Sequence, residues 1–126
     1  MKNPAAYKRL VDEIDDATKT GILSSPNIRY SEATKLSYLN ACCKEGMRVH
    51  PSVGLTLPRK VPRGGCTISG ELFPEGTRIG VNAAVIHFDK TIFGSDADNF
   101  NPDRWFREEA ANMDRYMFHV STLLLR

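Results

Sequence analysis

The sequence predicts an α+β fold with two amphipathic helices, a small antiparallel sheet and a long irregular loop. Three observations carry this prediction. Apolar residues recur at spacings of three and four in two stretches before Pro51, which is the period of a helix. Short β-type runs broken by glycine and proline follow from Val53. After Asp89 the chain is rich in Asp, Asn, Gly and aromatic residues and keeps neither period.

Composition limits what the chain can be. Its 126 residues are enough for one small domain at most, and 41% apolar with 25% charged residues is ordinary globular composition. The net charge is +2 and the basic residues are scattered, so we expect no nucleic-acid partner. No apolar run approaches the roughly 18 residues that cross a membrane, so we expect no membrane span in this chain.

The first helix is predicted to begin at Pro4 and to end before Gly21. Asn3 offers a capping side chain, and proline fits the first helical position. The apolar stripe that follows consists of Tyr7, Leu10, Val11 and Ile14. Residues 22–36 read as a connector with turn chemistry around Pro26.

The second helix is predicted to open at Ser37 and to run to about His50, because the residue before Pro51 disfavours helical geometry. Glu45 and Arg48 lie three apart and can pair on its surface. Their small apolar neighbours favour partial burial of the pair, and a buried charge needs hydrogen bonds from several directions. Lys44 is predicted to lie on the solvent-facing side.

The runs "VGLTLPRKV", "CTISG", "LFPEG" and "TRIGVNAAV" read as strands of hairpins. The segment "FGSDADNFNPDRWF" reads as a long loop, and a loop of this length inside a compact domain is either functional or evidence that partner segments are missing. We expect its aromatic residues to pin it: Phe93, Phe100, Trp105 and Phe106.

The cysteines and His87 give no metal-site pattern. Cys42, Cys43 and Cys66 are odd in number and include no C-x-x-C pair, so neither a disulfide framework nor a structural zinc site is expected. The two vicinal cysteines are predicted to be small core fillers. His87 is predicted to be a structural histidine.

The order of these features resembles a known family. A helix with Glu-x-x-Arg, a proline stop, "LPR", "GELFPEGT", "VIHFD" and "FGSDADNFNPDRW" follow one another as in the C-terminal third of the cytochrome P450 superfamily of haem-thiolate monooxygenases. The sequences of these motifs are similar to those of the fungal microsomal type, near the pisatin-demethylase-like group. The resemblance implies a fragment of a mainly α fold, with residues 1–118 a partial domain and 119–126 a tail outside the family that reads like intron translation.

The resemblance also implies roles for individual residues. Glu45, Arg48 and Arg104 would form a structural triad that ties the loop to the helix, with no catalytic residue among them. Arg59 would hold a haem propionate, although an edge-strand surface charge stays an open alternative. Apolar residues would line a substrate cavity, although core packing predicts the same composition: Val53, Gly54 and Leu55. Asp103 and Trp105 replace the commoner Glu and Phe, and we expect neither to affect the triad.

The function implied by the resemblance is haem-dependent oxidation of a small lipophilic substrate, with electrons from NADPH through a cytochrome reductase. A full-length parent is expected at the endoplasmic reticulum membrane. The family's axial ligand is a cysteine in a Phe-x-x-Gly-x-Arg-x-Cys-x-Gly loop, and no cysteine follows Cys66 here. We therefore expect no metal ligand, no bound haem and no activity for this chain alone. Two alternatives stay open: a catalytically inactive truncated remnant, and a non-enzymatic binding fragment.

Overall fold

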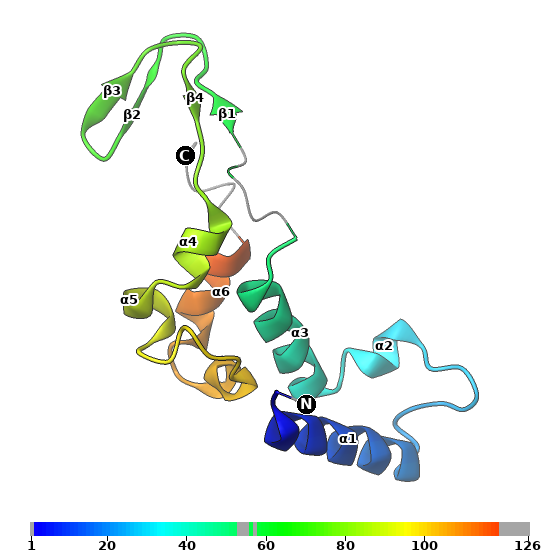
Figure 1. The fold of residues 1–126 in the computed structure, drawn as a ribbon. Helices are drawn as coiled ribbons and strands as arrows, with labels where there is room; N and C mark the ends of the chain where they lie inside the picture. Colours follow the sequence, from blue (N-terminus) through cyan, green and yellow to red (C-terminus); the bar gives the residue numbers. More distant parts are fainter. Residues whose placement is uncertain (1, 53–55, 57, 119–126) are drawn as a thin grey trace.

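The computed structural model describes residues 2–52, 56 and 58–118, and these residues confirm the α+β class (Figure 1). The helices are α1 (Pro4–Lys19), α2 (Tyr30–Ala33), α3 (Ser37–Val49), α4 (Ala83–His87), α5 (Lys90–Phe93), the 3-10 helix η1 (Pro102–Phe106) and α6 (Ala110–Phe118). The strands are β1 (Arg59–Lys60), β2 (Cys66–Ile68), β3 (Glu71–Phe73) and β4 (Arg78–Ile79). The substrate-cavity residues proposed above, Val53, Gly54 and Leu55, and the tail 119–126 lie outside the described residues.

The two long helices lie where the apolar period predicts them, but their starts differ in mechanism. α1 begins with Pro4 in its first turn, and Asn3 makes no side-chain capping bond. α3 also lacks a cap from its own N-terminal residues. Its first amides donate instead to the carboxylate of Glu13 on α1, with Tyr38 N and Leu39 N each 2.8 Å from a Glu13 oxygen.

Several short helices lie in segments that the sequence analysis assigned to strand or loop. α2 interrupts the predicted connector, α4 occupies the end of the predicted run "TRIGVNAAV", and α5 and η1 lie in the predicted loop. Local caps explain two of them. The Asn82 side chain accepts from Ala84 N at 2.9 Å, and the Asp89 side chain accepts from Thr91 N at 2.7 Å. An Asn or Asp oxygen placed this way starts a helix even where β-branched residues follow.

The predicted antiparallel pairing is divided between two short ribbons. In one, β2 pairs with β3 so that Cys66 faces Phe73; in the other, β1 pairs with β4 so that Arg59 faces Ile79. Figure 1 shows the β2–β3 hairpin at the opposite end of the fold from α1. In the described part of the chain, the hairpin thus lies away from the packing of α1 against α3 (Figure 1).

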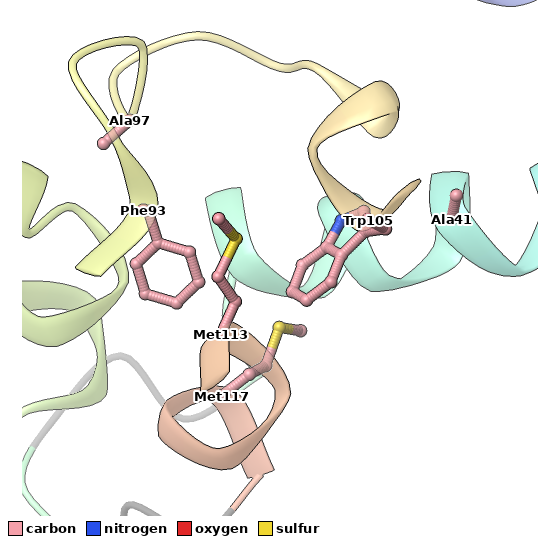
Figure 2. Close-up of a cluster of buried hydrophobic side chains, with 6 residues drawn as sticks. All are labelled: Ala41, Phe93, Ala97, Trp105, Met113 and Met117. Carbon is pink, nitrogen blue, oxygen red and sulfur yellow. The ribbon is translucent and has the colours of Figure 1, made fainter. Parts of the chain in front are cut away.

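The main hydrophobic cluster lies where α3, α5, η1 and α6 meet (Figure 2). Its centre is formed by Phe93, with no exposed surface, whose ring meets the edge of Trp105 at a centroid distance of 6.4 Å. The other members are Ala41, Ala97, Met113 and Met117. A second cluster joins α1 to the start of α3 through Ala17, Leu23 and Leu36. Since both clusters include residues of α3 or beside its start, this helix joins the two parts of the core.

Candidate functional site

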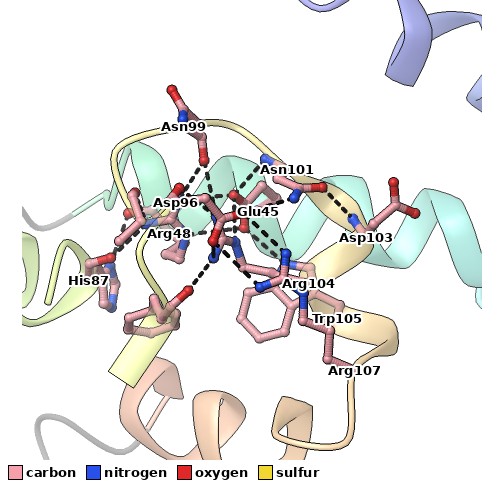
Figure 3. Close-up of polar contacts among 12 residues, drawn as sticks. Glu45, Arg48, His87, Asp96, Asn99, Asn101, Asp103, Arg104, Trp105 and Arg107 are labelled. Carbon is pink, nitrogen blue, oxygen red and sulfur yellow. Dashed lines mark hydrogen bonds and ion pairs between the residues drawn. The ribbon is translucent and has the colours of Figure 1, made fainter. Parts of the chain in front are cut away.

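Glu45 lies on α3 with no exposed surface, and its carboxylate accepts five hydrogen bonds (Figure 3). Arg48 grips it with both prongs, Nε at 3.0 Å from Oε2 and Nη2 at 2.8 Å from Oε1. Arg104 Nε donates to Oε1 at 3.0 Å, so Glu45 lies between two guanidinium groups. The amide of Asn101 at 2.9 Å and the indole Nε1 of Trp105 at 3.1 Å complete the set.

The remaining donors of Arg48 bind backbone carbonyl groups of the following segments. Nη1 donates to His87 O at 2.6 Å and to Ala97 O at 2.8 Å, and Nη2 donates to Asn99 O at 3.0 Å. An arginine carries five N–H donors, and all five are used here. The guanidinium therefore binds the end of α4 and the backbone of residues 97–99 to α3.

Arg104 repeats this pattern from the loop side. It is fully buried; its Nη1 donates to Phe93 O and to Asp96 Oδ1 at 3.2 Å, and its Nη2 donates to Asp96 O at 3.0 Å. A further bond from Nη2 reaches Asn99 O at 3.2 Å. Both buried guanidiniums thus share the Asn99 carbonyl, which fixes the turn between them.

Asp96 is the residue of this site that the sequence analysis missed. Glu45 alone would leave one of the two buried cations uncompensated, and an uncompensated buried charge is costly. Asp96 supplies the second negative charge and also binds Arg107 Nη2 at 3.1 Å. A count of buried charges would have indicated that a second carboxylate is needed, but not which of Asp96, Asp98 and Asp103 supplies it. We call Glu45, Arg48, Asp96 and Arg104 the Glu45 cluster.

The surroundings of these groups shift their protonation equilibria. Burial alone would raise the pKa of Glu45, but the hydrogen bonds and charges of Arg48 and Arg104 and the Asn101 amide lower it. Burial opposes the same shift in Asp96, whose pKa is lowered to about 2 by bonds from Asn101 and Arg107 and by the charges of Arg104 and Arg107. Burial lowers the pKa of His87, whose Nδ1 donates to Arg48 O at 3.2 Å. The lowered pKa values favour the ionised carboxylates of Glu45 and Asp96 and the neutral ring of His87.

The triad forms with Asp103 and Trp105 in place: Trp105 adds an indole hydrogen bond to Glu45, and Asp103 pairs with Arg9 of α1. The expectation for Lys44 is wrong. Lys44 is not a solvent-facing residue. Its side chain is 33% exposed, and its ammonium lies 2.7 Å from Asp114 Oδ2 on α6. The sequence pattern could not show this because α6 was not predicted.

Comparison with known proteins identifies the family. A sequence profile described as Cytochrome P450 matches residues 1–119. The chain belongs to the cytochrome P450 family. The match covers nearly the whole length of the chain.

Fungal relatives of this P450 chain are similar at high identity. The cytochrome P450 monooxygenase ACRTS1 of Alternaria alternata is 47% identical over 116 residues, which cover 92% of this chain and 30% of that protein. A pisatin demethylase of Fusarium vanettenii is 44% identical over 103 residues, 82% of this chain and 19% of that protein. The cytochrome P450 monooxygenase gsfF of Penicillium aethiopicum is 41% identical over 91% of this chain and 23% of its own length. The P450 chain therefore spans less than a third of the length of these relatives.

The family implies a haem cofactor, and the described residues do not fit a thiolate-ligated haem. Cys43 is exposed on α3, and Cys66 lies half-buried in the β2–β3 hairpin. Cys42 lines a hollow between α1 and α3 with Tyr7 and Leu10, and burial raises the pKa of its thiol, which disfavours the thiolate. Within the described ranges no three His, Cys, Asp or Glu side chains gather as metal ligands would.

The other predicted contact, Arg59, lies exposed at the start of β1 and takes part in no ion pair among the described residues. No helix in the described part of this P450 chain is long and apolar enough to cross a membrane.

Proposed function

We propose that this P450 chain is the segment of a haem-dependent monooxygenase that holds the irregular loop in place. The whole protein would oxidise a small lipophilic substrate with O2 and NADPH-derived electrons delivered by a cytochrome reductase, at the endoplasmic reticulum membrane. Family membership and relatives named monooxygenases support this proposal. The segment would comprise residues 1–118, with 119–126 outside the domain.

The observation that supports a structural role for the segment is that the hydrogen-bond donors of the Glu45 cluster are all used within the chain. Glu45, Arg48 and Arg104 have no exposed surface, and both arginines use every N–H donor on carboxylates or backbone carbonyls. Buried side chains whose hydrogen bonds are all made within the chain are unable to bind substrate or move a proton. Their role is structural, and breaking one partner of such a buried pair typically costs about 3–5 kcal/mol.

We further propose that this chain alone forms no haem-thiolate centre. Bound haem in this family supplies oxygen activation through an axial cysteine thiolate. Cys42 favours the thiol form, and Cys43 and Cys66 lie on separate elements, one exposed and one in a hairpin. Arg59 would contribute a propionate contact through its exposed guanidinium, which is suited to gripping a carboxylate with two prongs. Val53, Gly54 and Leu55 would contact substrate only in the complete enzyme.

One experiment tests the haem proposal on the chain itself. The purified chain is mixed with haem, reduced and exposed to carbon monoxide. We expect no red-shifted Soret band of the thiolate type. A thiolate-type band that disappears in Cys66→Ser or Cys42→Ser would overturn this proposal, and the variant that loses it would identify the ligand.

A second experiment tests the role of the segment. Residues 1–118 replace the matching segment of the Alternaria relative, and the chimera is assayed for the thiolate-type carbon monoxide band. We expect the chimera to retain the band, and the same chimera with Arg104→Ala to lose it. A folded chimera that never shows the band would favour the inactive remnant. A chimera in which Arg104→Ala is harmless would contradict the structural role of the Glu45 cluster.

A further inference from the structure

Trp105 contacts two different charged groups, one at its edge and one over its ring. The indole N–H donates to Glu45 Oε2 at 3.1 Å, and the Lys44 ammonium lies 5.3 Å from the ring centroid. The residue is 8% exposed. An ammonium within about 6 Å of an indole ring is attracted by its negative face. The orientation of the ring thus matters to both contacts.

The groups around Trp105 lead from the Glu45 cluster to α6. Lys44 pairs with Asp114 of α6 at 2.7 Å, and the other oxygen of Asp114 is buried and has no hydrogen-bond partner among the described residues. Met113 and Met117 of the same helix belong to the hydrophobic cluster of Trp105, and Figure 2 shows both thioethers near the indole. Asp114 is therefore paired with Lys44, and the ammonium of Lys44 lies over the indole ring.

We propose that Trp105 is a positioning residue that couples the Glu45 cluster to α6. Its N–H fixes the plane of the indole, and the fixed ring seats Lys44, which in turn holds Asp114. Phenylalanine at this position would fill much of the same space but would leave Glu45 Oε2 with Arg48 as its one donor. The proposal goes beyond the monooxygenase function, since it concerns the chain without cofactor.

The chain contains a single tryptophan, so one indole N–H signal reports on this contact. In the 15N-labelled full chain we expect that proton to exchange with solvent slowly. Loss of a hydrogen bond to a charged group corresponds to a change of about tenfold or more. An indole proton in the wild-type chain that exchanges as fast as that of free tryptophan would overturn the proposal without any variant.

Substitutions at Lys44 test the coupling through the ring. Lys44→Met and Asp114→Asn should each speed indole exchange about threefold, the size expected for one partly exposed cation–ring or ion-pair contact. Lys44→Arg keeps the cation and should restore the wild-type rate. Lys35→Met removes an exposed lysine that lies just before α3 and is the matched control. Equal rates in Lys44→Met and Lys35→Met would overturn the proposal.

A variant that removes only the N–H tests the transmission to α6. The benzothiophene analogue of tryptophan, in which sulfur replaces the N–H group, keeps the ring shape at position 105. We expect the amides of Met113 and Met117 to exchange about tenfold faster, because one hydrogen bond to a charged group is lost. The amides of Tyr38 and Leu39 at the far end of α3 should be unchanged. Unchanged exchange at Met113 and Met117 would overturn the coupling.

Discussion

Arg104 is predicted to contribute strongly to stability, because its guanidinium has no exposed surface and pairs with the carboxylates of Glu45 and Asp96. Arg104→Ala should lower the free energy of unfolding by about 3–5 kcal/mol, since Glu45, Asp96 and several buried carbonyl groups each lose a donor. Arg63→Ala, at an exposed position, should change it by less than about 0.5 kcal/mol. Urea unfolding of the full chain, followed by tryptophan fluorescence, measures both. Equal losses would contradict the burial of the pair.

Protonation of His87 should lower stability in mildly acidic solution. Burial lowers the pKa of the ring below its ordinary 6.5, so below that pH the unfolded chain binds a proton that the folded chain does not. Stability from this group is complete above pH 6.5 and is lost as the pH falls. A second loss, from Asp96, should follow between about pH 4 and about pH 2, because its folded pKa is about 2 and its ordinary value is 3.8.

The variant His87→Asn separates these effects. The amide keeps a donor near the position of Nδ1 and does not titrate, so its unfolding free energy should be flatter between pH 7 and pH 5. Urea midpoints measured across this range check the prediction. Parallel curves for the variant and the wild-type chain would show that another group titrates there.

At the scale of elements, α3 depends on α1 for its N-terminal cap. Glu13 accepts from two amides of the first turn, and carboxylates at this position also interact favourably with the helix dipole. Glu13→Gln should cost about 1 kcal/mol. The amides of Tyr38 and Leu39 should exchange faster, whereas Asp15→Asn, at an exposed position of α1, should leave them unchanged. Faster exchange in Ser37→Ala but not in Glu13→Gln would mean that Ser37 is the cap.

Two glycines in different elements should respond oppositely to alanine. Gly65 precedes β2 with φ +80°, and a Cβ there would lie 2.8 Å from the carbonyl oxygen of Phe73. Gly65→Ala should therefore destabilise the β2–β3 hairpin by more than about 1 kcal/mol. Gly46 lies inside α3, where a Cβ would meet no atom within 4 Å beyond its neighbours and the helix backbone, and Gly46→Ala should stabilise the helix by about 0.5–1 kcal/mol. Amide exchange in β2 and urea unfolding, respectively, measure the two effects.

At the scale of the whole molecule, α3 connects the parts of the fold. It carries Ala41 in the main cluster, Glu45 and Arg48 in the Glu45 cluster, and Lys44 toward α6. The strands lie apart from these contacts and pair with one another. Large exposed apolar side chains are scattered over separate elements: Tyr30 on α2, Leu72 on β3 and Val85 on α4. Changes to the strands should thus leave the Glu45 cluster intact.

The sequence by itself determined the α+β class, the two long helices and the family. Apolar residues at helical spacing give α1 and α3 one apolar side each, and Pro51 prevents α3 from continuing. The motifs Glu-x-x-Arg and "NPDRW" also named in advance three residues that the structure brings together, Glu45, Arg48 and Arg104. Helical spacing explains the Glu45–Arg48 pair, whereas the part of Arg104, 59 residues from Glu45, was implied by the family resemblance.

Only the tertiary structure decided the rest of the site. Asp96 balances a buried charge, Glu13 caps a helix that begins 24 residues later, and Trp105 and Lys44 act across α3, η1 and α6. Asp96 lies 8 residues before Arg104, and the other partners are much farther in sequence from the groups they serve, so no helical or strand period encodes these pairings. The physical reason is that a buried charge or amide requires a partner in space. Which residue supplies that partner depends on where the folded chain places it.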